Sequence, residues 1–594
     1  MRVGHGGWRT VLGLELRLQV REPLTWLYAI VLLTLTAGFT GSGVVALVPR
    51  ALRGDAAATA PLVLALAMSG LGAFAQVITT MVMVTAMLRD IATRTAPLLL
   101  ASPISTADLL TGRVAAALIV LAIVTLGMPV GAVVGALATD ASVMGVAVTA
   151  MGVWVGIVLP TVLLTGAVQA WVATRSASLY VTLAATLVLL VLWQVTTSST
   201  VVDMVGPWSV ALDPFGSAPL LATTRAQRAL ETASPWTALL TVNRVGAVIV
   251  GLAVLAVVRR GRRPRAAEAV RAPRTAASPV RAPRRTDVMA LPPSTAGGWR
   301  DSAALAWRTL SRERAFVIIA ALGAINVAAN VWSALAPRAT TATLGDALSL
   351  AITHGRLFCI LLATIWAGEL LWRERDLRVD GLIDASPIST SASLLGRVAT
   401  LLAVEGVVAV TLAGSAVVAA STAGVRLSWR AAPEVALWTV AVCWLPFALL
   451  TLLSLAVHVL VRHKVVAHLL LITTWVVAVA LDGAGFDRAW YRVGAVAPGA
   501  WSATRGAQPL LPWVSLHWAL VAVTALLVAR LGWPRGRRIP RPSRSAWVAL
   551  AVCLVLVALS ARAVDVRDRP ERTTPPTGPV GGVGPALDQV SARR

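Results

Sequence analysis

The feature that most constrains this chain is a long series of apolar stretches, each about 20 residues long and separated by short charged segments. Apolar residues fill 57% of the 594 positions and charged residues only 13%, about half the share usual in soluble domains. In a lipid bilayer, backbone groups without hydrogen-bond partners are costly, so stretches of this kind must be helices. The sequence therefore predicts an all-α, polytopic integral membrane protein.

We expect two series of six membrane-spanning helices and one further span at the C-terminal end. The first series comprises 25–48, 61–87, 114–137, 143–172, 178–198 and 238–258. The second series comprises 315–336, 347–371, 398–424, 434–461, 465–482 and 514–531, and the thirteenth span is 546–561. Pro160 and Pro446 would allow kinks in the two long spans that contain them.

These spans predict four regions along the chain. Residues 1–258 form a first six-span unit that begins with an interfacial helix, and 259–298 form a basic cytoplasmic linker. Residues 299–531 form a second six-span unit. Residues 532–594 hold a basic loop, the thirteenth span and a disordered external tail.

The positions of the arginines predict the orientation. Lys464 is the only lysine, so arginine supplies nearly all of the positive charge behind the formal net charge of +25. Residues 259–285 contain ten arginines and a single acid, Glu268, and they lie between apolar stretches. Because basic loops stay in the cytoplasm, we expect the N terminus and the linker on that side. The positive charge is thereby explained by membrane topology, without a nucleic-acid partner.

The chain is internally duplicated. Gly6-Gly7-Trp8-Arg9 recurs as Gly297-Gly298-Trp299-Arg300, and Ala-Ser-Pro-Ile-Ser-Thr at 101–106 recurs at 385–390. Around the second motif, 16 of the 32 positions from 89 to 120 are identical to their counterparts in 373–404, aligned without a gap. Apolar bias could produce similarity inside a span, but not a six-residue match in a polar loop. Each unit has an even number of spans, so both copies should face the same way.

The first recurring segment, 8–22 and 299–314, places tryptophan, leucine and arginine at helical spacing just before a span. This pattern is typical of a helix lying in the membrane interface, although a plain topology anchor would look similar. The residues of these two predicted interfacial helices are Trp8, Arg9, Arg21 and Glu22, and Trp299, Arg300, Arg312 and Glu313.

The second recurring segment is the cytoplasmic loop between the second and third spans of each unit, at 88–113 and 372–397. In the first copy, Pro103 interrupts any helix that enters the loop, and Ser105 with Asp108 resembles the cap of a new short helix. In the second copy Ser389 can cap, but Ala392 replaces the acid. We expect the isoleucine of each loop to be exposed and to contact another protein; the alternative is a tight turn that only reverses the chain. The candidate residues are Ser102, Pro103, Ile104, Ser105, Thr106 and Arg113, and Ser386, Pro387, Ile388, Ser389, Thr390 and Arg397.

The order of segments in each half resembles that of the permease subunits of ABC-2 type transporters. It consists of an interfacial helix ending in Arg-Glu, then a span, then a loop that reads LLLASPISTADLLTGR at 98–113. The resemblance covers both halves and is strongest at 89–120 and 373–404. It implies that the recurring loop is the coupling helix, which docks on a separate ATPase subunit. In that family the loop between the fifth and sixth spans carries short re-entrant helices, and Asp213-Pro214-Phe215-Gly216 lies at that place. The chain departs from the family by fusing two units and by adding a thirteenth span.

The expected function is therefore that of a transmembrane permease subunit of an ABC transporter, with export as the expected direction, in the bacterial plasma membrane. ATP would bind to the separate ABC ATPase subunit, because the only lysine follows His463 and no phosphate-binding loop is present. No His-Glu-x-x-His or Gly-x-Ser-x-Gly motif occurs, so we expect no catalytic, cofactor-binding or metal site on this chain. The expected partners are the ATPase subunits and membrane lipid.

Two other functions remain open at this point. An ion-coupled secondary transporter with internal repeats would need carboxylates within its spans, and Glu369 and Glu405 are the candidates. Both lie in the second unit, which weakens that interpretation. A membrane scaffold that does not transport would use the C-terminal tail, which looks too short for a folded module.

The predicted topology can be tested with reporter fusions. A reporter fused near Ala266 should be cytoplasmic, whereas one fused after Pro570 should be external, because a thirteenth span separates the two sides. Reporter activity on each side of the membrane in whole cells checks this. The thirteenth span is refuted if both fusions are found on the same side.

Overall fold

The structure is a computed structural model that describes residues 7–41, 57–93, 95–197, 210–226, 233–260, 298–312, 314–376, 379–384, 388–426, 432–461, 463–483, 488, 490, 510–533 and 543–573. Within these residues, all regular secondary structure is helical. The basic run beyond Arg260, the predicted linker up to 297 and the tail beyond Thr573 lie outside the described part of the chain.

The prediction of a multi-pass helical membrane protein is confirmed. In the described part of the chain, nine helices are long and apolar enough to cross a membrane, and eleven if each of two bent pairs counts as one span. The predicted spans at 178–198 and 465–482 coincide with helices whose described apolar parts, Val181–Thr197 and Lys464–Thr474, are shorter than the others. The count of thirteen spans therefore stays a prediction.

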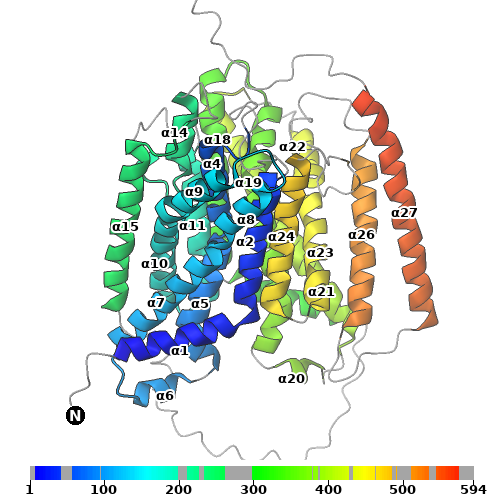
Figure 1. Ribbon diagram of the computed structural model, residues 1–594. Helices are drawn as coiled ribbons and strands as arrows, with labels where there is room; N and C mark the ends of the chain where they lie inside the picture. The colour runs from blue at the N-terminus through cyan, green and yellow to red at the C-terminus, as the bar shows by residue number, and fades with distance from the viewer. Residues whose placement is uncertain are drawn as a thin grey trace, which may run out of the picture. The chain divides into compact units, whose positions relative to one another are not determined.

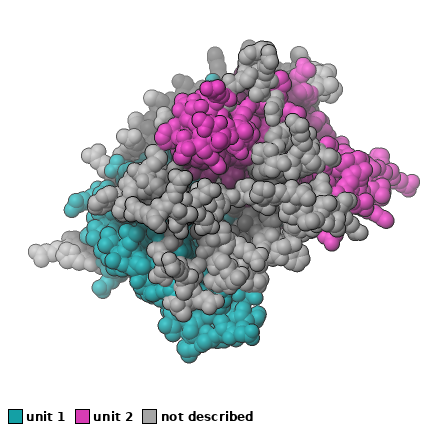
Figure 2. Space-filling view, turned by 90° about the horizontal axis from the view of Figure 1, so that it is seen from above, with its two compact units in different colours: residues 1–290, 311–322, 473–486 teal, residues 291–310, 323–472, 487–594 magenta. Residues whose placement is uncertain are grey.

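The chain divides into two compact units, which Figure 2 colours separately. The first contains residues 1–290, 311–322 and 473–486, and the second contains 291–310, 323–472 and 487–594. The division near residue 290 falls inside the predicted linker. The two short segments 311–322 and 473–486 group with the first unit, although the sequence places them in the second series of spans.

The first unit begins with a helix that runs across the ends of the long helices rather than along them (Figure 1). This helix, α1, and the short α6 lie at one end of the unit, and α14 lies at the opposite end (Figure 1). Ser105, Ser142 and Thr237 begin helices by accepting a backbone N–H three residues later. The helices are α1 (Gly7–Arg21), α2 (Pro23–Gly41), α4 (Pro61–Phe74), α5 (Gln76–Thr93), α6 (Ala96–Ala101), α7 (Thr106–Thr125), α8 (Gly127–Ala136), α9 (Val143–Val153), η1 (Trp154–Val158), α10 (Leu159–Ser176), α11 (Leu179–Thr197), α14 (Ser217–Ala226) and α15 (Ala238–Arg259).

The second series of helices repeats this order. It comprises α17 (Gly298–Ser311), α18 (Arg314–Leu335), η2 (Ala336–Arg338), α19 (Leu344–Asp376), α20 (Asp380–Asp384), α21 (Thr390–Thr422), α22 (Ala432–Trp438), η4 (Thr439–Trp444), α23 (Leu445–Leu460), α24 (Lys464–Gly483), α26 (Leu511–Gly532) and α27 (Arg544–Thr573).

The long fourth helix of each series contains the same irregularity. A π-helical turn, η1 or η4, ends just before Leu159-Pro160 and Leu445-Pro446 respectively. Proline has no N–H and its ring crowds the preceding turn, so a wider turn lets the helix continue through it. The sequence allowed kinks at Pro160 and Pro446, and the structure shows that each proline is preceded by this local widening. The shared irregularity is a structural sign of the duplication.

Glycines allow α8 to pack very closely against α2. A Cβ added at Gly127 or Gly135 would lie 2.5 Å from the carbonyl oxygen of Ala29 or Ala37, and one at Gly131 would lie closer still to that of Leu33. These glycines form the overlapping GxxxG motifs of the sequence. This spacing of small residues is typical of close helix packing in membranes.

The last helix is longer than predicted. α27 begins at Arg544 and continues to Thr573, although the sequence predicted a span ending at 561 and a disordered tail after it. Its charged end is held by side chains: the Arg567 guanidinium lies 3.8 Å from the ring centroid of Trp513, and Arg488 pairs with Asp565 at 2.7 Å. Nearer the apolar part, His517 Nδ1 and Ser560 Oγ are 2.9 Å apart. These contacts stabilise the helical extension.

The close packing of α8 on α2 predicts a strong effect of a single methyl group. Gly131→Ala should lower the free energy of unfolding by about 1–3 kcal/mol, because the two backbones would have to move apart. Thermal unfolding of the purified protein in detergent measures this. Gly246→Ala on α15, where a Cβ meets open space, is the matched control and should have little effect. Equal behaviour of the two variants would contradict the close contact.

Candidate functional site

The predicted interfacial helix and the start of the third span are in direct contact in the first unit. A Cβ added at Gly112 of α7 would lie 2.7 Å from both the carbonyl oxygen of Trp8 and the Cβ of Val11. Only glycine allows α1 to approach α7 this closely. The repeated Gly-Arg pair that ends each loop therefore has a packing role at its first position.

The α1 helix buries a polar stripe and exposes leucines. Val11, Glu15 and Gln19, spaced four residues apart, are its buried residues, whereas Leu14 and Leu18 are exposed. In water this arrangement would be unfavourable, but leucines facing outward suit a helix that lies against lipid. The arrangement supports the interfacial position predicted for this segment.

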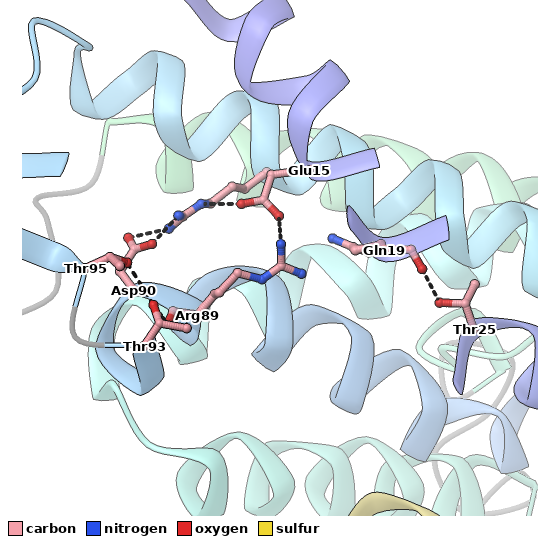
Figure 3. A network of polar contacts seen from close by, with 8 residues as sticks. Glu15, Gln19, Thr25, Arg89, Asp90, Thr93 and Thr95 are labelled. Carbon is pink, nitrogen blue, oxygen red and sulfur yellow. Dashed lines mark hydrogen bonds and ion pairs between the residues drawn. The ribbon is translucent and has the colours of Figure 1, made fainter. Parts of the chain in front are cut away.

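Four charged side chains, of which Figure 3 labels Glu15, Arg89 and Asp90, form a network that is buried at its centre and partly exposed at Arg89 and Asp90. Arg113 Nε donates to Glu15 Oε1 at 3.1 Å, and Arg89 Nη1 donates to Glu15 Oε2 at 2.9 Å. Arg113 also donates two hydrogen bonds to the Asp90 carboxylate, one of them at 2.7 Å. Glu15 is 3% exposed and Arg113 is 5% exposed. Two acids and two arginines balance in charge, as buried ions require.

The second unit repeats this arrangement with fewer charges. A Cβ added at Gly396 would lie 2.9 Å from the carbonyl oxygen of Trp299 and 2.6 Å from the Cβ of Ser302. Trp299 and Ser302 correspond to Trp8 and Val11 when the two Gly-Gly-Trp-Arg motifs are aligned, so α17 meets α21 as α1 meets α7. We refer to each set of interfacial helix, loop and the adjoining ends of the second and third spans as the base of its unit.

The ion pair of the second base also follows the repeat. Arg397 Nη2 donates to Glu374 Oε1 at 2.5 Å, and its Nη1 donates to Ser393 Oγ at 2.6 Å. Glu374 and Arg397 occupy the places of Asp90 and Arg113 when 373–404 is aligned with 89–120. Where the first base has Glu15, the second has Ala306, so the interfacial helix contributes no acid there.

The predicted caps of the loops are confirmed. Ser105 Oγ accepts the Asp108 N–H at 3.0 Å and donates to Asp108 Oδ2 at 2.7 Å, and Ser389 Oγ accepts the Ala392 N–H at 3.1 Å. The helices they open are α7 and α21, which continue as long apolar helices. The prediction of a separate short helix after each serine is therefore wrong; the short helices, α6 and α20, come before the loop motif.

The loop residues differ in exposure. Pro103 and Ser105 are exposed, whereas Ile104 and Ile388 are half-buried, less exposed than the sequence predicted. Among the described side chains near the first loop, the most exposed large apolar one is Leu98 on α6, at 74%. Ser102, Thr106 and Thr390 are half-buried and Ser389 is exposed, while Ser386 and Pro387 lie outside the described residues.

The remaining predicted site residues belong to the bases. Arg113 and Arg397 are buried, so they hold the loops from inside instead of presenting a charge at the surface. Trp8 and Trp299 are half-buried, and the guanidinium of the next residue lies 5.6 Å from the ring centroid in both units. Arg9, Arg21, Glu22, Arg300 and Arg312 are exposed, and Glu313 lies outside the described residues.

Sequence reasoning did not identify the acids of the bases. Asp90 and Glu374 follow the identical Arg89 and Arg373 in the repeat, and an acidic residue retained in both copies is a signal that could have pointed to them. Glu15 had no such signal, because the second copy lacks it. Its role depends on the helix α1 folding back onto α7, which a single sequence does not reveal.

The opposite end of the first unit contains the predicted Asp-Pro-Phe-Gly segment. Asp213 accepts the N–H groups of Phe215 at 2.9 Å and Ala218 at 2.6 Å, which begins the short α14. Burial raises the pKa of the Asp213 carboxyl, and these N–H groups and the nearby Arg244 oppose the shift. Arg244 also donates to Thr161 Oγ1 at 2.9 Å.

The carboxylates named for an ion-coupled transporter have protein partners. Glu405 Oε1 accepts a hydrogen bond from Thr451 at 3.0 Å, and Glu369 pairs with Lys464 at 3.2 Å. No group of three or more potential metal ligands occurs among the described residues.

Comparison with the models of known protein families and with curated proteins gave no match for this chain. The function of the chain is therefore inferred from the geometry of the two bases and from the sequence resemblance.

The two bases should differ in their sensitivity to loss of arginine. Arg113→Met should cost about 3–5 kcal/mol of unfolding free energy, because the largely buried Asp90 would lose its cation and the buried Glu15 would keep only Arg89. Arg397→Met should cost only about 1 kcal/mol, since the Glu374 side chain is 31% exposed and can be solvated. Unfolding in detergent compares the two variants. Adding Glu15→Gln and Asp90→Asn to Arg113→Met should restore part of the loss; no recovery would show that the charges are not the cause.

Proposed function

We propose that this chain is the transmembrane permease subunit of an ABC transporter, an exporter powered by ATPase subunits on separate chains. The observation that carries the proposal is the duplicated base. In each unit, glycine packing and a buried arginine join the interfacial helix, the loop and the second and third spans. A loop held in this way can pass a force from a docked partner to two spans together.

The exposed part of the first loop suits a protein partner. Leu98 on α6 and Pro103 in the turn are exposed, and Ile104 beside them is half-buried. Burying a side chain such as Leu98 fully against a partner would contribute about 1.5–3 kcal/mol. The expected partner is the ATPase subunit, which would bind ATP, since this chain has no phosphate-binding loop.

An ion-coupled transporter is the second candidate, and the buried Glu405 is the observation that favours it. Glu405 is 3% exposed and lies on α21, in the middle of a helix long enough to span a membrane. Its counterpart in the first unit, with the two loop motifs aligned, is Leu121, so only one unit carries the carboxylate. An ion-coupled mechanism that uses both repeats is therefore less well supported than docking of an ATPase. The bases occur in both units, whereas the carboxylate occurs in one.

The proposal predicts the effect of an aspartate placed on the loop. Leu98→Asp and Ile104→Asp, alone or together, should weaken co-purification of the ATPase subunit at least about tenfold, because a contact of about 1.5–3 kcal/mol is lost. Ile388→Asp should do the same for the second loop. Pull-down of the ATPase from membranes, with ATP hydrolysis measured on each preparation, checks both.

Leu137→Asp is the matched control. Leu137 is the same residue type, is 70% exposed and follows α8 in a different loop. It should retain the ATPase. The purified chain alone should not hydrolyse ATP, and turnover without a second polypeptide would contradict the proposal. The proposal would also be contradicted if the complex were unchanged when Leu98→Asp, Ile104→Asp and Ile388→Asp are combined, because the loops would then be ordinary turns.

A further inference from the structure

A cluster of uncharged polar side chains lies in the core of the first unit. The hydroxyl oxygens of Thr80 on α5 and Thr186 on α11 are 2.5 Å apart, and Gln169 Nε2 on α10 donates to Thr186 Oγ1 at 3.0 Å. All three side chains are at most 2% exposed. The three helices pack against one another in each pairwise combination. Thr80 precedes Arg89 by about two and a half helical turns, so the cluster is separate from the base.

Several polar atoms at this cluster have no hydrogen-bond partner among the described residues. They are Nε2 and Oε1 of Gln76, Oε1 of Gln169 and Nε1 of Trp193. Gln76 lies one turn before Thr80 on α5, and Trp193 lies about two turns after Thr186 on α11. This spacing places both on the helix faces that carry the cluster. Buried polar groups in native proteins are normally paired, so donors and acceptors left over on three adjoining helices indicate a place for a ligand.

The backbone is also irregular at this point. The helices α4 and α5 form a bent pair at 42°, and Gln76 is the first residue after the bend. At membrane depth, a broken helix is tolerated where protein surrounds it or where it lines a cavity. Broken helices of this kind border substrate sites in transporters. The bend and the unpartnered amide therefore point independently to the same location.

The second unit shows that the fold does not need the two glutamines here. Ile360 corresponds to Gln76 when the two loop motifs are aligned, and Leu455 corresponds to Gln169 when the two Leu-Pro pairs of the fourth helices are aligned. Ile360 and Leu455 are both buried. The second unit thus has apolar side chains at both glutamine positions, whereas Thr364, which corresponds to Thr80 in the same alignment, keeps a buried hydroxyl. The glutamines of the first unit are therefore a specific feature of that unit.

We propose that Gln76, Thr80, Gln169, Thr186 and Trp193 form a binding site for the uncharged hydroxyl- or amide-bearing group of an amphipathic molecule. None of the five side chains is charged, so a charged group would lose its hydration there without gaining a counter-ion. Amide and hydroxyl side chains offer both donors and acceptors, as such a neutral group requires. The inference deepens the proposed function by naming a class of cargo, and it rests on that function only for the step of transport.

A cysteine at the cluster provides a direct test of binding. Thr186→Cys is placed in a chain whose Cys359, Cys443 and Cys553 are changed to alanine, and the protein is reconstituted in phosphatidylcholine vesicles. Labelling by methyl methanethiosulfonate, a small neutral reagent, is then followed with octyl glucoside, octyl sulfate or octyltrimethylammonium present below micellar concentrations. We expect octyl glucoside alone to slow labelling, about fivefold or more. Equal protection by all three amphiphiles, or none by octyl glucoside, overturns the proposal.

The residues of the second unit supply the test variants. Gln76→Ile with Gln169→Leu should abolish protection by octyl glucoside while leaving the melting temperature unchanged or higher, because unpaired amides are removed. Thr174→Val is the control, since that hydroxyl bonds only to carbonyls of its own helix, Ala170 and Trp171. It should keep the protection. Persistence of protection in the glutamine double variant would also overturn the site.

This labelling requires no ATPase. A chain that shows selective protection but never associates with an ATPase would contradict the proposed function alone. Conversely, a chain that transports with its ATPase but shows no protection would contradict only the binding site.

Discussion

A guanidinium group buried at the start of a membrane helix must have acids beside it, and this constraint organises each base. Arg113 is held by Glu15 and Asp90, which come from two other helices, so one side chain ties three elements together. Gly112, the residue before it, lets α1 lie close enough for Glu15 to reach. The Gly-Arg pair thus works as a unit: the first residue makes the approach possible and the second stabilises it.

Much of the fold could be predicted because hydropathy alone identifies long apolar helices. The predicted third and fourth spans of each series coincide with α7 and α8, α9 and α10, α21, and α22 and α23. The capping serines were also predictable, because an N-cap depends only on residues close in the sequence. A serine just before an apolar run can accept the backbone N–H three residues later. The close contact at Gly127, Gly131 and Gly135 also has a local signal, because glycines four residues apart leave a groove on one helix face.

The parts that sequence reasoning missed depend on contacts between distant segments. The salt bridge between Glu15 and Arg113 joins residues 98 positions apart, and no local sequence pattern predicts it. The short helices α6 and α20 were placed on the wrong side of the loop motif, because an N-cap gives the start of a helix but not its length. The helical extension of α27 was missed because Arg567 and Asp565 have the appearance of charges in a solvated tail. Their partners, Trp513 and Arg488, are distant in the sequence.

The distance along the chain between paired charges also has a consequence for synthesis. Glu15 pairs with a residue 98 positions later, whereas Glu374 pairs with Arg397 only 23 positions later. Glu15 has an earlier partner in Arg89, 74 positions later. On a ribosome that adds about 5–20 residues per second, Glu15 therefore waits roughly 4–15 s for its first partner, and Glu374 waits roughly 1–5 s. During that interval the N-terminal helix carries an uncompensated acid and must remain where water can reach it. The first base therefore closes only after the start of the third span has been made, so α1 is the earliest helix of its unit to be synthesised but must wait for two later spans before it reaches its final place.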